Sequence, residues 1–111
     1  MAFDAFDVVV VPFPFTDRLA SKRRPAVVLS QPETLREGQI LLAMVTSSTR
    51  ESWASDVAIN DHTEAGLTVP CCVRFKVFTL DENQIVRRIG RLSSRDGHAV
   101  EVSLRQVFGL A

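Results

Sequence analysis

Short apolar runs separated by polar, turn-rich segments make up most of the chain. The runs are rich in Val, Ile, Leu and Phe and are shorter than most helices, a pattern typical of buried or half-buried β-strands. Polar segments without periodicity, among them residues 16–24 and 47–53, are expected to be loops, and residues 32–37 to form one helical turn. From this pattern we predict strands at residues 7–11, 26–29, 39–46, 56–59, 68–80 and 84–92.

The one convincing helical pattern lies at the end of the chain. Ser93 is a suitable N-cap, and Asp96, three residues later, completes a variant of the capping box. Gly109 is placed where the helix can end. Between them, four apolar residues recur at helical spacing and define a face expected to pack: Val100, Leu104, Val107 and Phe108.

Five or six short strands followed by one helix predict a mainly β (α+β) fold, built as a strongly curved sheet or a partly open barrel. The length of 111 residues predicts one domain over residues 1–111. The longest apolar candidate, residues 8–11, is cut by Pro12 and is far shorter than the ~20 residues of a membrane span. The first residues lack the basic segment and apolar core of a secretory signal, so we expect a cytoplasmic protein.

Charge is balanced over the whole chain but segregated along it. Lys and Arg number 13, as do Asp and Glu, and the pI is near 6.7. This excludes a protein that coats nucleic acid by bulk attraction, because such domains usually have a pI above ~9. The cations, nearly all Arg, gather in residues 18–24 and 87–95, whereas residues 51–64 collect acids. Arg suits phosphate binding; the alternative is that these segments are solvated loops and strand edges.

The two cysteines, Cys71 and Cys72, are adjacent in the sequence. That spacing fits neither an unstrained disulfide nor a metal site. We therefore expect two free, half-buried thiols on a strand and no structural metal.

Three segments form a recognisable signature. The first is residues 7–17, DVVVVPFPFTD, followed by residues 22–30, KRRPAVVLS. The second is residues 43–47, AMVTS, and the third is residues 73–93, which begins VRFKVFTLD. In order and spacing these segments resemble the MazF/PemK-like toxins of bacterial type II toxin–antitoxin systems over nearly the whole chain, specifically their Pro-Phe-Pro-Phe-Thr-Asp branch.

The resemblance implies a small SH3-like barrel of the CcdB/MazF/PemK type with a C-terminal helix, a homodimer, and cleavage of single-stranded RNA with no metal or other cofactor. It also implies a cognate antitoxin that inhibits by laying an extended acidic segment in the RNA groove. The family's catalytic pair, an Arg before Pro and a Thr at the end of the third strand, corresponds to Arg24 and Thr46. The RNA-binding residues predicted here are Lys22, Arg23, Ser47, Arg50, Trp53, Arg74 and Arg87.

The chain departs from better-known members in two places. They usually have Gly before the first Asp, where this chain has Phe6 before Asp7. Their first loop tends to be longer and to contain glycine, whereas residues 16–24 contain none. Cleavage sequence and loop gating therefore do not carry over from those members.

The residues themselves suit metal-free RNA cleavage, in which the 2′-OH is the nucleophile. The enzyme must hold the phosphate in line and stabilise the charge that grows on its oxygens. The planar fork of Arg24 can grip two oxygens, and Pro25 stiffens the backbone beside it. Thr46 or Ser47 can donate a hydroxyl hydrogen bond to the same phosphate. The sequence offers no evident general base.

For several other residues, both a functional and a purely structural role are considered. Trp53 can stack on an unpaired base, or it can cover the core or a dimer interface. For His62 and His98, which lie in no motif, surface or capping roles are favoured over catalysis, with contact to RNA open for His62. The phenylalanines are expected in the core or an interface rather than as base platforms: Phe13, Phe15, Phe75 and Phe78.

Two alternatives to a ribonuclease follow from the same resemblance. The fold also hosts a toxin that poisons DNA gyrase by contact through its C-terminal residues, so fold alone does not decide function. In this chain residues 105–111 are largely apolar and are expected to pack instead. The other alternative is an inactive homologue that only binds its antitoxin, against which the intact pair of Arg24 and Thr46 argues.

Overall fold

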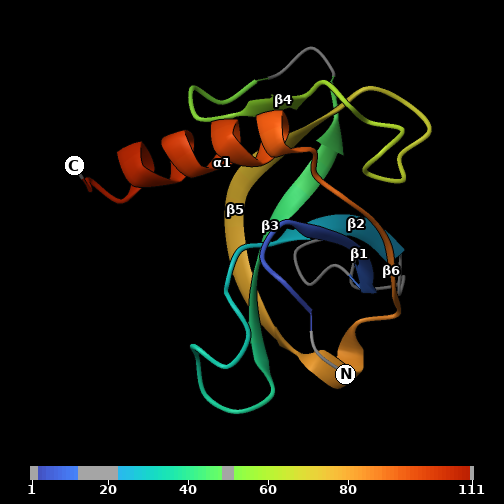
Figure 1. Ribbon diagram of the computed structural model, residues 1–111, viewed down its shortest axis with the longest axis vertical. Helices are drawn as coiled ribbons and strands as arrows, with labels where there is room; N and C mark the ends of the chain where they lie inside the picture. The colour runs from blue at the N-terminus through green and yellow to red at the C-terminus, as the bar shows by residue number, and fades with distance from the viewer. Residues whose placement is uncertain (1–2, 13–22, 49–51, 111) are drawn as a thin grey trace.

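The computed structural model describes residues 3–12, 23–48 and 52–110, and in this part of the chain six antiparallel strands form one curled sheet followed by an α-helix (Figure 1). The order across the sheet is β4-β5-β3-β2-β1-β6. The elements are β1 (Asp7–Pro12), β2 (Arg23–Val28), β3 (Gln39–Ser47), β4 (Val57–Ile59), β5 (Cys71–Asp81), the 3-10 turn η1 (Glu82–Gln84), β6 (Arg87–Arg91) and α1 (Ser94–Val107). The predicted mainly β fold with a C-terminal helix is confirmed. No helix within the described ranges is long and apolar enough to cross a membrane.

Where the observed elements differ from the predicted ones, the cause is local. β2 begins at Arg23, earlier than predicted, because its basic first half still pairs with β1. β5 begins at Cys71, later than predicted, because the residues before it form a bend. The helical turn predicted at residues 32–37 is wrong: this segment is a series of turns and bends, in which Glu33 has a φ of 61°.

The curled sheet buries apolar side chains on both of its faces. Since successive side chains of a strand point to opposite faces, Val8 and Val27 enter one core cluster and Val9 and Ala26 enter the other. All four are fully buried. The first cluster is closed by α1 and by the loop between β4 and β5, and the second by the residues before β1 and after η1. The face of the second cluster is the one that continues toward Arg24.

The helix α1 packs through fewer apolar residues than predicted. Ser93 caps it and Gly109, with a φ of 69°, follows its end, both as predicted. Val100 is fully buried, but Val107 and Phe108 are 45% and 51% exposed. The second half of the predicted apolar face is therefore wrong, because the C-terminal half of α1 runs out past the sheet (Figure 1).

Asp96 has a different role from the reciprocal capping box predicted for it. Its carboxylate is buried and accepts hydrogen bonds from the backbone N–H groups of Asn60 (3.1 Å) and Asp61 (2.8 Å). Further along α1, the Ser103 hydroxyl donates to the Ser55 carbonyl oxygen at 2.9 Å. These contacts tie the helix to both ends of the segment that contains β4. They hold in place residues 55–61, the segment that contains Asp56 of the candidate site.

The unusual residue before β1, Phe6, has a structural explanation. Its φ is 74°, in the left-handed region where a residue other than glycine costs about 1–2 kcal/mol. Its N–H donates to the Val28 carbonyl (2.6 Å) and its own carbonyl accepts from the Leu92 N–H (3.0 Å). The ring packs on the start of α1, where a Cβ added to Gly97 would lie 3.3 Å from a ring carbon. Packing against the helix thus offsets the backbone strain that a glycine would avoid.

Candidate active site

Arg24 and Thr46 lie level with each other on neighbouring strands. The β2–β3 ladder pairs Ala26 with Met44 in an antiparallel register. When this register is continued by two residues, Arg24 falls across from Thr46. Because side chains alternate along a strand, both extend from the same face of the sheet as Ala26 and Met44, and both are half-buried. The fold therefore brings the two residues of the predicted catalytic pair to one place.

Arg24 carries a buried polar atom that the rest of the described structure leaves unpaired. Its backbone is fixed in the ladder opposite Val11 of β1, and Pro25 is fixed opposite Val10. Within the part of the chain that the structure describes, its buried Nε has no hydrogen-bond partner. An unpaired buried donor costs about 1–3 kcal/mol. An anionic oxygen placed against this Nε would remove that cost.

A second cluster lies beside this pair. Thr46 is paired with Cys72 of β5, and Met44 with Arg74, so Cys72 and Arg74 flank the pair on the same face. Ser47, next along β3, is exposed and extends to the other side, because it pairs with Cys71 of the first core cluster. The geometry therefore separates Ser47 from Thr46.

Arg74 is held in a two-point ion pair with Asp56. Its Nε donates to Asp56 Oδ1 (3.2 Å) and its Nη2 donates to Oδ2 (2.9 Å), and the two side chains are only 13% and 10% exposed. The backbone N–H of Trp53 donates to the same Oδ2 at 2.9 Å. The guanidinium carbon of Arg74 lies 5.0 Å from the centroid of the Trp53 ring, within the range of a cation–π contact. Trp53 itself is 44% exposed.

The hydrogen bond from Arg74 holds the pKa of Asp56 below its ordinary value of 3.8, and burial of the carboxyl opposes this shift only in part. Since this pKa is lower in the folded than in the unfolded chain, ionised Asp56 contributes stability above pH 3.8 and loses it as pH falls through the folded value. We expect Asp56→Asn to lower the free energy of unfolding most at pH values well above 3.8, and less below it. Urea unfolding of parent and variant across a pH series measures this, and a pH-independent difference would contradict it.

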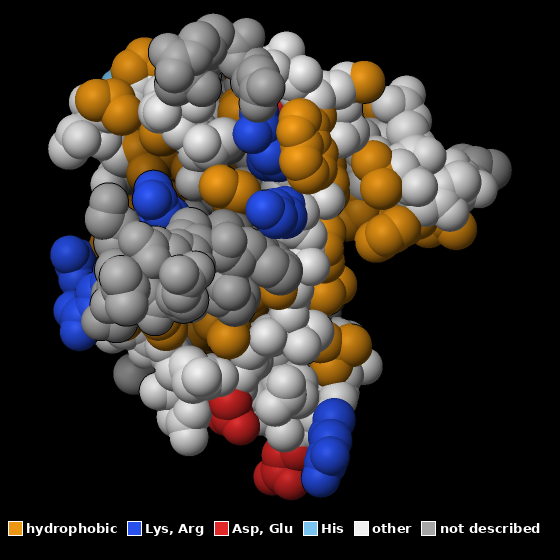
Figure 2. Space-filling view, turned by 180° about the vertical axis from the view of Figure 1, so that it is seen from behind, with side chains coloured by type: hydrophobic (Ala, Val, Ile, Leu, Met, Phe, Trp, Pro, Cys, Tyr) orange, Lys and Arg blue, Asp and Glu red, His pale blue; other side chains and the backbone are white. Residues whose placement is uncertain are grey.

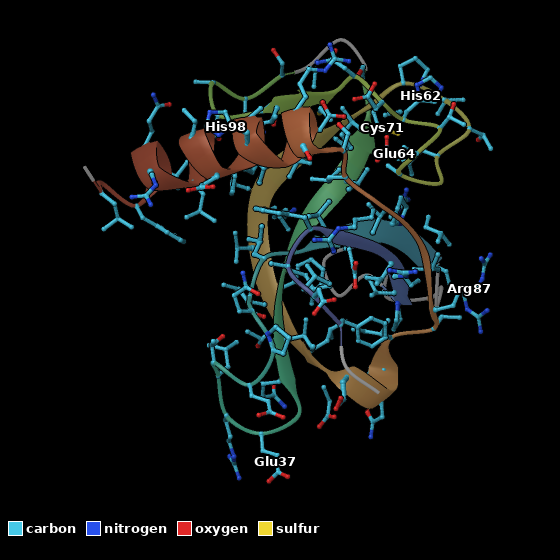
Figure 3. All side chains as sticks on the ribbon, viewed as in Figure 1. Glu37, His62, Glu64, Cys71, Arg87 and His98 are labelled. Atoms are coloured by element: carbon cyan, nitrogen blue, oxygen red, sulfur yellow. The ribbon has the colours of Figure 1, made fainter. Side chains whose placement is uncertain are left out.

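The other predicted RNA-binding residues are scattered. Arg23 is exposed and next to Arg24 but extends from the opposite face of β2. Arg87 is exposed on β6, at the edge of the sheet order and away from β3, and its side chain projects outward in Figure 3. Lys22 and Arg50 lie outside the described residues, as do Phe13 and Phe15. The roles of all these residues in RNA binding stay predictions.

Most of the Arg-rich segment at residues 87–95 is used in ion pairs with acids from elsewhere. Arg88 and Arg91 contact the buried Asp7 carboxylate at 3.4 Å and 2.9 Å, and Arg95 contacts Asp61 at 3.0 Å. Within residues 87–95, the fold thus pairs three of the four Arg side chains with acids that are distant in the sequence. Where Lys and Arg do gather, on the face shown in Figure 2, they lie beside exposed hydrophobic side chains.

The cysteines and histidines contribute no reactive cluster. Cys71 and Cys72 are free and buried, and burial raises the pKa of each thiol, which favours the unreactive protonated form. His62 lies in the loop after β4 and His98 on α1, and they point to different sides (Figure 3). Among the residues that the structure describes, no group of three or more His, Cys, Asp or Glu side chains could hold a metal ion. The expected core positions of Phe75 and Phe78 are confirmed.

Asp56 is the site residue that sequence reasoning missed. It directly precedes β4, and the β4–β5 register, with Val57 opposite Val73, sets it across from Arg74 when continued by one residue. In the sequence it is one of several acids in the acid-rich stretch of residues 51–64. Only the strand register, which depends on tertiary pairing, distinguishes it from the others.

Residues 4–108 match the family described as "PemK-like, MazF-like toxin of type II toxin-antitoxin system". The match spans nearly the whole chain, and the chain therefore belongs to this family of toxins. No curated protein sequence matches significantly.

Solved structures show the same fold at low sequence identity. A MazE–MazF crystal structure from Deinococcus radiodurans superposes with a TM-score of 0.76 at 19% identity, covering 100% of this chain and 99% of that chain. The Mycobacterium tuberculosis toxin MazF-mt6 gives 0.72 at 20% identity, covering 95% and 98%. An endoribonuclease in complex with its cognate antitoxin, from a mycobacterial species, gives 0.74 at 12% identity, covering 99% and 96%. The fold of this chain is thus the fold of these MazF structures.

Proposed function

We propose that this chain is the toxin of a type II toxin–antitoxin system and acts as an endoribonuclease, an mRNA interferase that cuts single-stranded RNA at specific sequences without a metal. Family membership supports the toxin role, and solved structures of the same fold include proteins named as endoribonucleases. The observation that carries the proposal is the buried Nε of Arg24, which has no hydrogen-bond partner among the described residues and lies on the face that also presents Thr46.

The proposed reaction needs no covalent enzyme intermediate. The 2′-oxygen attacks the adjacent phosphorus, the bond to the 5′-oxygen breaks, and the proton lost by the 2′-OH is balanced by one gained at the 5′-oxygen. Arg24 holds the non-bridging oxygens and stabilises the charge that grows on them, while the Thr46 hydroxyl donates to the same phosphate. The products are a 2′,3′-cyclic phosphate and a 5′-hydroxyl end.

The proposed partners follow from the same family. We infer that residues 1–111 act as one domain, that the toxin is a homodimer, and that it meets mRNA in the cytoplasm. A cognate antitoxin would inhibit it with an extended acidic segment, whose carboxylates satisfy Arg24 in place of a phosphate. Solved MazE–MazF complexes of this fold are consistent with such a partner.

The direct test is cleavage of a long single-stranded RNA by the purified chain in EDTA. We expect cuts at one short recurring sequence, with 2′,3′-cyclic phosphate ends, and protection of the same sequence within a duplex. Intact RNA in EDTA, or cutting that appears only after a divalent metal is added, would contradict the proposal.

One observation favours the alternative of a toxin that binds a protein target such as DNA gyrase. The C-terminal apolar residues expected to pack are exposed: Val107, Phe108 and Leu110 are 45%, 51% and 56% accessible. A supercoiling assay run beside the RNA assay separates the two functions. Inhibition of gyrase without RNA cleavage would favour this alternative, and antitoxin binding without either activity would indicate an inactive homologue.

A further inference from the structure

The ring of Trp53 contacts the guanidinium of Arg74 and remains partly exposed. Its backbone N–H is bonded to Asp56, and its ring lies against the Arg74 guanidinium, which Asp56 in turn holds by two hydrogen bonds. The backbone N–H of Asp56 also donates to the Trp53 carbonyl at 3.0 Å, closing the turn. The Trp53 side chain nevertheless remains 44% exposed. A large apolar ring fixed in this way, and not covered, has the properties of a binding surface.

We propose that Trp53 is a stacking platform for one unpaired nucleobase of the bound strand, and that Asp56 and Arg74 are positioning residues that hold the ring in place. The proposal rests on the proposed function and specifies how the same site takes its substrate. It also gives Arg74 an indirect role, through the ring, in place of the direct contact with RNA predicted from the sequence.

Trp53 lies close enough to Arg24 and Thr46 to contact a base next to the phosphodiester bond that is cleaved. Arg74 pairs with Met44, two residues along β3 from Thr46, and extends from the same face. Adjacent strands are ~4.8 Å apart and two residues span ~7 Å, so the platform base lies on the order of 10 Å from the Thr46 backbone. A nucleotide adjacent to the reacting phosphate can reach it.

Charge at the platform favours a base over the other groups that could lie there. The Arg74 cation is paired with Asp56 at 2.9 Å, so it is poorly placed to attract a phosphate. The Asp56 carboxylate disfavours an acidic peptide in the same position, because like charges at close range repel. A nucleobase is uncharged and offers a flat π-face, and base–aromatic stacking tolerates any sequence. The prior fixing of the ring reduces the entropy that binding has to remove.

The chain itself supplies the probe, because Trp53 is its only tryptophan. We would titrate the protein with a single-stranded oligodeoxynucleotide, which lacks the 2′-OH and cannot be cut by 2′-OH attack. We expect intrinsic fluorescence to be quenched as the oligonucleotide binds, with binding followed independently by the anisotropy of a dye on its 5′ end. An abasic strand of equal length should bind more weakly and leave the tryptophan fluorescence unchanged.

Substitutions test the ring and its supports separately. Trp53→Ala should weaken oligonucleotide binding by on the order of 10- to 100-fold, and Trp53→Phe by less. Leu35→Ala is the matched control. Leu35 is 39% exposed in the loop that precedes β3, at the end of the strand away from Thr46, so this variant should bind the oligonucleotide normally. Asp56→Asn should weaken binding and increase the mobility of the ring in time-resolved tryptophan anisotropy. Combined with Trp53→Ala it should add no further loss, because Asp56 acts through the ring.

The results of these experiments test the stacking platform and the proposed ribonuclease activity independently. Binding without quenching, or equal quenching by the abasic strand, would overturn the platform while leaving RNA cleavage intact. Quenching with normal base dependence but no RNA cleavage would support the platform and count against the ribonuclease. An additive loss in the double variant would overturn the positioning role of Asp56. Quenching by an acidic antitoxin peptide but not by an oligonucleotide would overturn the nucleobase as occupant.

Discussion

Replacing Arg24 with alanine is expected to lower the rate of RNA cleavage by on the order of 10²–10³, the usual cost of losing a preorganised group that stabilises transition-state charge. The fold should survive, because the Arg24 Nε is buried without a partner in the described structure and gives up no hydrogen bond there. We expect the free energy of unfolding to stay within about 1 kcal/mol of the parent. Single-turnover cleavage in EDTA and urea unfolding measure the two quantities.

Two further variants determine what the Arg24 result means. Arg24→Lys keeps the charge but loses the planar two-point fork, so it should recover only part of the rate. Arg36→Ala removes an exposed Arg from the loop between β2 and β3 and should cleave at the parental rate. Full activity in Arg24→Ala would refute the assignment of this residue. An equal loss in Arg24→Ala and Arg36→Ala would show that only net charge matters.

The candidate pair was accessible from sequence because it lies in short local motifs. Arg24 directly precedes Pro25, and Thr46 lies near the end of an apolar strand, so a family resemblance could assign both residues. Asp56 was not accessible in this way, because its partner Arg74 lies across the β4–β5 ladder. Residues whose role depends on strand register become visible only when the strands are paired.

For the fold, too, features set by local sequence could be predicted, whereas features set by tertiary packing could not. The strands and the Ser93 cap follow from local pattern, and they were predicted well. The burial of α1 was predicted poorly, because helical periodicity marks an apolar face without saying how far the sheet beneath it extends. Val100 lies over the sheet and is buried, whereas Phe108, two turns later on the same face, is exposed. The ion pairs of the Arg-rich segment also depend on tertiary structure and could not be predicted from the sequence. Arg91, for example, pairs with Asp7, which lies near the other end of the chain.

Replacing Gly90 with alanine is expected to destabilise the fold by about 3 kcal/mol or more. Gly90 lies in β6 opposite Val8, where the β4–β5 loop packs backbone against backbone. A Cβ there would overlap the Ala65 carbonyl group and lie 2.7 Å from the Glu64 carbonyl oxygen. That oxygen accepts from the Arg91 N–H at 3.3 Å, so the loop cannot retreat without losing this bond. Urea unfolding of the variant gives the free energy directly.

The matched control, Gly109→Ala, separates backbone contact from backbone conformation. Gly109 has a φ of 69°, so alanine is strained there, yet nothing lies within 4 Å of the added Cβ. We expect a loss of only about 1 kcal/mol, from the left-handed backbone alone. Gly90 has the opposite combination: its φ is outside the left-handed region, but its Cβ position is crowded. A larger loss of unfolding free energy in Gly90→Ala would therefore measure how tightly the β4–β5 loop packs on β6. Equal losses at the two sites would contradict the close packing of the loop on β6.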